Sequence, residues 1–76
     1  MKEILETLIK NLVSDPNAVS INEIEGEKSV TFEVKVASSD MGRVIGRQGR
    51  VAKAIRTFMK AVASKEQKRV SIEFLD

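Results

Sequence analysis

The segment of this sequence with the clearest chemical capacity is Gly46-Arg47-Gln48-Gly49. Glycine has no Cβ, so two glycines at this spacing let the backbone come within contact distance of a ligand and present its amide groups. Arg43, Arg47 and Arg50 add three positive charges around the same loop. These features are suited to binding an anion, most simply a phosphate of a nucleic-acid backbone.

A helix predicted from about residue 50 strengthens this interpretation. Its first amide groups have no partner within the helix, and the positive end of its dipole points towards the glycine loop. An anion at the loop would therefore meet donors from three sources: the loop backbone, the helix N-terminus and the arginine side chains.

Two better-known phosphate loops are excluded by their spacing. A P-loop needs Gly, four residues and then Gly-Lys-Ser/Thr, and neither Gly42 nor Gly46 begins such a run. A dinucleotide-binding fingerprint needs G-x-G-x-x-G, whereas Gly42, Gly46 and Gly49 are spaced four and three residues apart. A GxxG pair by itself is also compatible with a plain helix-breaking turn, so its surroundings carry the interpretation.

The distribution of charge points to the same half of the chain. Residues 1–40 contain four basic and eight acidic side chains, whereas residues 41–76 contain nine basic and three acidic ones. Between Met41 and Lys65 there are seven basic residues and no Asp or Glu. Such a run is typical of a surface that binds a polyanion, and the alternative is a basic, solvated helix face.

Composition excludes several classes of function. The 76 residues allow one domain, and the absence of both Cys and His excludes disulfides and the common zinc and iron sites. The usual nucleophile–base pairs of enzymes are absent for the same reason. We therefore expect a non-enzymatic protein without cofactor or metal. No apolar run is long enough for a signal peptide or a membrane span, so we expect a cytoplasmic protein.

Hydrophobic periodicity predicts the elements upstream of the loop. Residues 2–13 place apolar side chains at helical spacing. Residues 18–25 are predicted to form a strand, with a bulge at Ile24 where the alternation breaks. Gly26 is predicted to make the following turn with a positive φ. Residues 30–36 alternate cleanly and give the clearest strand.

The second half of the chain carries the loop between two predicted helices. Residues 38–40 offer N-caps for a short helix at residues 41–45. A long helix is predicted at residues 50–63, and a last strand at residues 70–74. The predicted buried stripe of the long helix consists of Val51, Ile55, Phe58 and Val62. The fold class is therefore α+β, in the order helix-strand-strand-helix-helix-strand, with three helices on one face of a three-stranded sheet.

The loop and its surroundings resemble a known family. Val44-Ile45-Gly46-Arg47-Gln48-Gly49, followed by Ala54 and Ile55 on the long helix, is similar to the signature of KH domains. The element order resembles the bacterial, type II arrangement, and residues 1–76 as a whole resemble the small stand-alone KH proteins of bacteria.

This resemblance implies a single KH domain that binds single-stranded RNA, with the GxxG loop clamping about four nucleotides. The implied RNA contacts are Arg43, Val44, Ile45, Gly46, Arg47, Gln48, Gly49, Arg50, Val51 and Lys53. The resemblance also implies that bases lie in an aliphatic groove, with Ala52, Ile55 and residues 32–36 contributing. Taken singly, each of these apolar residues is more typical of the core than of a ligand contact.

The biological role is likewise implied only by the resemblance. It indicates an RNA chaperone or post-transcriptional regulator linked to cell shape and cell-wall homeostasis. It also indicates a partner among the Jag-family (KhpB) RNA-binding proteins.

The alternative function is a protein-interaction module. The long helix is apolar over more than one core stripe, which favours a homodimer or a heteromer. The predicted contacts are Ala52, Met59, Ala61 and Ala63. The competing explanation is that alanine is simply a good helix former.

Overall fold

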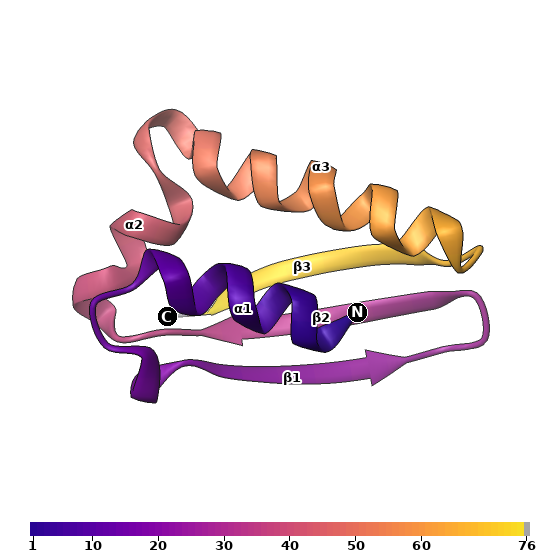
Figure 1. The fold of residues 1–76 in the computed structure, drawn as a ribbon, viewed down its shortest axis with the longest axis horizontal. Helices are drawn as coiled ribbons and strands as arrows, with labels where there is room; N and C mark the ends of the chain where they lie inside the picture. The colour runs from indigo at the N-terminus through magenta and orange to yellow at the C-terminus, as the bar shows by residue number, and fades with distance from the viewer. Residues whose placement is uncertain (76) are drawn as a thin grey trace.

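The computed structural model describes residues 1–75, and its element order confirms the predicted α+β class (Figure 1). The helices and strands are α1 (Lys2–Leu12), β1 (Ser20–Glu25), β2 (Ser29–Lys35), α2 (Met41–Ile45), α3 (Arg50–Lys65) and β3 (Arg69–Leu75). Short 3₁₀ turns join them at Pro16–Ala18, Ser38–Asp40 and Arg47–Gly49. Asp76, which the single-domain prediction includes, lies outside the described residues. Among residues 1–75, no helix is both long and apolar enough to cross a membrane.

The three strands form one mixed sheet in the order β1-β2-β3. β1 and β2 pair antiparallel through their hairpin, with Ile21 opposite Val34. β3 runs parallel to β2, with Ile72 beside Phe32. A parallel pair needs a long connection, and α2 and α3 supply it. These two helices and α1 cover one face of the sheet (Figure 1).

The core forms where the alternating residues of β2 meet the helices. Val30, Phe32 and Val34 are at most 1% exposed, while Thr31 and Glu33 on the opposite face remain partly exposed. α1 covers this strand with the fully buried Leu5 and Ile9. β2 is thus the central strand, and its period of two is the signal that the sequence displayed most clearly.

The predicted buried stripe of α3 is wrong for most of its members. Phe58 is 49% exposed, and Val51 and Val62 are half-buried. The residues that face the core are Ala52, Ile55, Met59 and Ala63. Two alanines in this stripe let the helix approach its neighbours closely. The larger Val51 and Phe58 lie instead on the side of α3 that faces α1.

Three smaller expectations are also corrected. β1 begins at Ser20 and pairs continuously with β2, so there is no bulge at Ile24, whose side chain is 52% exposed. Gly26 closes the hairpin by donating its N–H to the Ser29 carbonyl at 2.7 Å, and it does so without a positive φ. α3 continues to Lys65, two residues beyond the predicted end.

Candidate nucleic-acid interface

The two glycines of the loop are needed for different physical reasons. Gly46 has φ 76° and ψ 171°, a region that is essentially restricted to glycine. A Cβ placed there would lie 2.4 Å from Val51 Cγ2 and 2.8 Å from the Val51 backbone nitrogen. Gly49 has φ 73° and ψ 14°, but a Cβ there would have no atom within 4 Å. Gly46 therefore permits the close contact with α3, while Gly49 only permits the turn.

Gln48 takes a left-handed conformation although it is not a glycine. Its φ is 58° and its ψ is 26°. This conformation costs an L-residue about 1–2 kcal/mol, and such strain is found preferentially at ligand-binding sites. Sequence patterns could not predict it, because the preference of Gln for this region is low.

The loop amides that can meet an anion are not those of the glycines. The Gly46 N–H donates to the Gly42 carbonyl at 2.8 Å, and the Gly49 N–H donates to the Gly46 carbonyl at 3.1 Å. The Arg50 N–H likewise donates to the Arg47 carbonyl. The candidates are therefore the amides of Arg47 and Gln48, together with amides of the first turn of α3 after Arg50. The glycines shape the loop, and their neighbours supply its donors.

The side chains predicted to contact RNA separate into exposed and buried groups. Arg47, Gln48 and Arg50 are exposed at the tip, where Arg50 Nη2 lies 3.5 Å from Gln48 Oε1. Ile45 and Val51 are half-buried at its base, while Val44 is fully buried and belongs to the core. The polar and flanking residues are thus brought together at one surface, and Val44 lies beneath it.

Asp40 was predicted as a helix cap, and the structure gives it a different role. It is fully buried and makes no side-chain cap bond to α2. Its carboxylate accepts the Ser14 N–H at 3.0 Å, the Ser14 hydroxyl at 2.8 Å and the Asp15 N–H at 3.1 Å. These bonds, with the Ser14 backbone N–H contributing most, lower the pKa of the Asp40 carboxyl. Asp40 therefore fastens α2, and the loop it carries, to the segment after α1.

Arg43 is held by the same carboxylate. Its Nε lies 3.3 Å from Asp40 Oδ1, although the Arg43 side chain is 62% exposed. Part of its positive charge is thus compensated within the fold. Arg47 and Arg50, at the tip of the loop, are more fully available to an anion. The tie between Asp40 and Ser14 spans 26 residues, so no local pattern could have predicted it.

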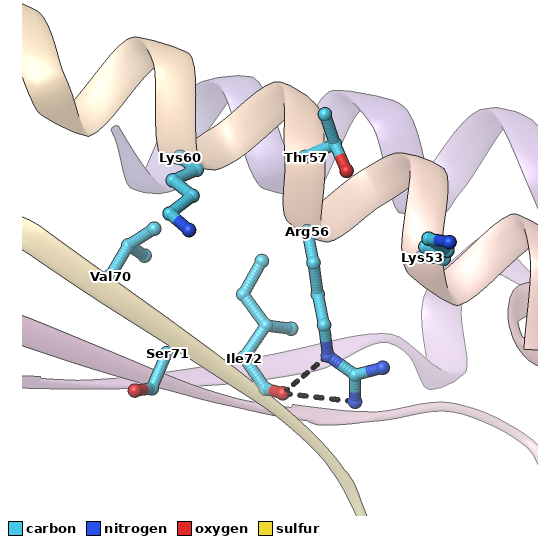
Figure 2. Close-up of a pocket in the computed structure, with 7 residues that line it drawn as sticks. All are labelled: Lys53, Arg56, Thr57, Lys60, Val70, Ser71 and Ile72. Atoms are coloured by element: carbon cyan, nitrogen blue, oxygen red, sulfur yellow. Dashed lines mark hydrogen bonds between the residues drawn. The ribbon is translucent and has the colours of Figure 1, made fainter.

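A groove of about 370 Å³ lies between α3 and β3 (Figure 2). It is lined by Lys53, Arg56, Thr57, Lys60, Val70, Ser71 and Ile72. None of these seven residues is acidic. Lys53 follows Arg50 by three residues on α3, so these two cationic side chains are neighbours on the helix surface, and Lys53, Arg56 and Lys60 place three cations along the groove.

The groove differs from the predicted set of residues in two ways. It lies along β3, at the edge of the sheet, whereas Phe32, Val34 and Val36 of the predicted segment are buried. It includes Lys53, which was among the predicted contacts, and also Arg56 and Lys60, which were not. Their spacing of three and seven residues from Lys53 places all three on one face of a helix, which was the available signal.

An apolar surface lies on the other side of α3, facing α1. We define this α1–α3 surface by Ile4, Leu8, Val51, Ala54 and Phe58. These residues line two adjoining hollows, the larger of about 520 Å³. This surface differs from the predicted partner contact. Of the four residues predicted for that contact, Ala61 is exposed, while the other three are at most 2% exposed: Ala52, Met59 and Ala63.

Three helices over a three-stranded sheet, with a GxxG loop joining two of the helices, define a KH domain of the type II order. The family described as "KhpA/KhpB, KH domain" matches residues 2–74. The chain belongs to this family, which is non-enzymatic.

Curated relatives match the chain over almost its whole length. A Clostridium acetobutylicum protein named "RNA-binding protein KhpA" is 56% identical over 99% of this chain and 100% of its own. A Caldanaerobacter subterraneus protein of the same name is 55% identical over the same shares. An Aquifex aeolicus protein, also of that name, is 45% identical over 100% of this chain and 96% of its own.

Proposed function

We propose that this protein binds single-stranded RNA and that the loop from Gly46 to Gly49 clamps the RNA backbone. The observation that carries the proposal is the convergence at one surface of the loop amides, the N-terminus of α3, and the exposed Arg47 and Arg50. Each of these groups favours a phosphate. The names of the relatives support RNA as the polyanion.

The adjoining groove supports a single strand rather than a duplex. Its volume of about 370 Å³ suits individual bases, and its walls combine apolar side chains of β3 with cationic side chains of α3. Unpaired bases can leave the stack and enter such a groove, whereas a duplex keeps its bases inside. The backbone would then follow the loop while one or more bases lie between Lys53 and Val70.

The test replaces Arg47 and Gln48 together with aspartate. Acidic residues at a helix N-terminus are compatible with folding, so the thermal unfolding followed by circular dichroism should change little. The two carboxylates would repel a phosphate, so the affinity for a single-stranded RNA should be lost in a gel-shift assay. Unchanged affinity in the folded variant would refute the assignment of this loop.

A matched control carries the same change of charge elsewhere. Replacing Lys28 and Asn17 with aspartate alters two exposed residues, and the hairpin that holds Lys28 lies at the end of the sheet away from the loop (Figure 1). This variant should keep most of the RNA affinity. An equal loss in both variants would indicate a general charge effect rather than a clamp.

We extend the proposal to the cellular role implied by the family resemblance: an RNA chaperone or post-transcriptional regulator that acts in cell shape and cell-wall homeostasis. The family description, which joins KhpA with KhpB, supports a KhpB-type (Jag-family) partner. Deleting the gene and restoring it with the aspartate variant of the loop tests this role. Normal cell shape with the loop variant would separate the role from RNA binding.

A second candidate function is self-association through the α1–α3 surface. Phe58 is 49% exposed and Ile4 is 41% exposed, and together with Leu8 they line adjoining hollows, so they form the kind of contiguous apolar patch that marks a protein–protein contact. Glu3 borders one end of the surface and Arg50 the other. A two-fold axis through its centre would place the Glu3 end of each copy beside the Arg50 end of its partner.

Sedimentation at micromolar concentration tests this homodimer. Phe58→Glu would place a charge in the contact and should give a monomer. Ile24→Glu is the matched control, because Ile24 is equally exposed at 52% but lies on β1. A monomeric wild type would exclude the homodimer and leave a different partner protein for this surface.

A further inference from the structure

Arg56 crosses the groove from α3 and is held against the edge of the sheet. Its Nε and Nη2 both donate to the Ile72 carbonyl oxygen, at 3.3 and 3.2 Å (Figure 2). Its guanidinium carbon lies 5.4 Å from the centre of the Phe74 ring, within the range of a cation–π contact. The guanidinium plane is therefore fixed from two directions, although Arg56 is an exposed residue.

This arrangement leaves part of the guanidinium available. The group carries five N–H donors, and the two bonds to Ile72 use two of them. The remaining three are on Nη1 and Nη2. Figure 2 shows the nitrogen without a dashed line turned away from the Ile72 oxygen. A planar, preoriented pair of donors is the geometry that arginine uses to bind two neighbouring acceptors at once.

We propose that Arg56 is a specificity-determining residue that selects RNA bases with two adjacent hydrogen-bond acceptors. Guanine presents such a pair at O6 and N7, and cytosine presents one at O2 and N3. Adenine places its amino donor beside N7, and uracil carries a proton on N3 between its two carbonyl groups. This inference rests on the proposed RNA-binding function and adds a base preference to it.

The other cations of the groove cannot make this selection. Lys53 and Lys60 end in compact ammonium groups, which act as point charges and do not match a pair of acceptors in one plane. The apolar Val70 offers contact area that any base can use. Among the groove residues, Arg56 therefore combines a fixed plane with paired donors.

The experiment measures fluorescence anisotropy with labelled eight-nucleotide RNAs. The reference is an all-uridine strand, and three others carry two guanines, two cytosines or two adenines at its centre. The wild type should bind the guanine or the cytosine strand about tenfold more tightly than the adenine and uridine strands. If the guanine strand is preferred, a strand with 7-deazaguanine in place of guanine lacks N7 and should lose the preference.

Two variants distinguish base selection by Arg56 from general electrostatic attraction of RNA and from a purely structural role of Arg56. Arg56→Lys keeps the charge but loses the paired donors, so it should bind all four strands within about twofold of one another. Lys53→Ala should weaken binding to all four strands while the preference remains. Thermal unfolding of Arg56→Lys shows how much the bonds to Ile72 stabilise the fold.

The outcomes are distinguishable. Equal binding of all four strands by the wild type would overturn the inference while leaving the proposed RNA-binding function intact. A preference that persists in Arg56→Lys would also overturn it, and together with a lowered melting temperature would make Arg56 a structural residue. Absence of binding to every strand would overturn the proposed function and the inference together.

Discussion

Replacing Gly46 with alanine is expected to destabilise the protein far more than replacing Gly49, although both glycines belong to one loop. At Gly46 the new Cβ would lie 2.8 Å from the Val51 backbone nitrogen, which cannot rotate away. It would also lie 2.4 Å from Val51 Cγ2. At Gly49 the Cβ would enter open space, and only the positive φ opposes it.

The size of each expected loss of stability follows from the backbone conformation of the glycine and from the steric overlap of the new Cβ. The backbone conformation of Gly46 costs another residue about 1–3 kcal/mol, and the overlap with Val51 adds about 1–3 kcal/mol. We therefore expect Gly46→Ala to lower the free energy of unfolding by about 3 kcal/mol or more. Gly49→Ala should lower it by about 1 kcal/mol. Gly42→Ala, in the helical α2 with no atom within 4 Å of the new Cβ, should raise it by about 0.5–1 kcal/mol.

Urea denaturation of the three variants, followed by circular dichroism, measures this order. A domain of this size has only about 5–10 kcal/mol of stability, so Gly46→Ala should shift the midpoint by a large fraction of its wild-type value. Equal loss of stability in Gly46→Ala and Gly49→Ala would refute the reasoning, because it would mean that the approach of the loop to Val51 is not a constraint.

Three further predictions concern charge and strain. If binding neutralises two to four phosphates, a plot of log affinity against log salt concentration should have a slope of about −1.4 to −2.8. Arg50→Ala should make this slope shallower by about 0.7. A salt-independent affinity would contradict the clamp. The pKa of Asp40 lies below that of a free aspartate, which is about 4. The ionised carboxylate therefore stabilises the fold above about pH 4, and this stabilisation is lost as the pH falls through the lowered pKa. Asp40→Asn should therefore be less stable in urea at pH 7 and lose less stability on acidification than the wild type. Gln48→Gly should relieve the left-handed strain and raise the melting temperature, and an unchanged or lower value would show that Gln48 is not strained.

The parts of the fold that could be predicted are those that local sequence patterns determine. The alternation in residues 30–36 identified the central strand, and the loop was located from the spacing of Gly46 and Gly49. The run of basic residues correctly placed the cationic surface along α3. Each of these signals is read from residues close together in the sequence, without knowledge of the tertiary fold.

The parts that could not be predicted depend on tertiary packing. Both Ala52 with Met59 and Val51 with Phe58 form apolar stripes on α3, and the sequence alone does not decide which one faces the sheet. Burial of the small stripe brings the helix close and leaves Phe58 outside. The bond from Arg56 to Ile72 likewise joins residues 16 positions apart, so only the fold reveals it.

Titration of isotope-labelled protein with a single-stranded RNA, followed by amide chemical shifts, tests the central claim most directly. Binding through the loop and groove predicts the largest changes at residues 46–53 and at Val70–Ile72, where the loop, the first turns of α3 and β3 meet the ligand. The amides of β1, at the opposite edge of the sheet, should change little. Large changes confined to α1 and the Phe58 side of α3, with residues 46–49 unaffected, would contradict this account.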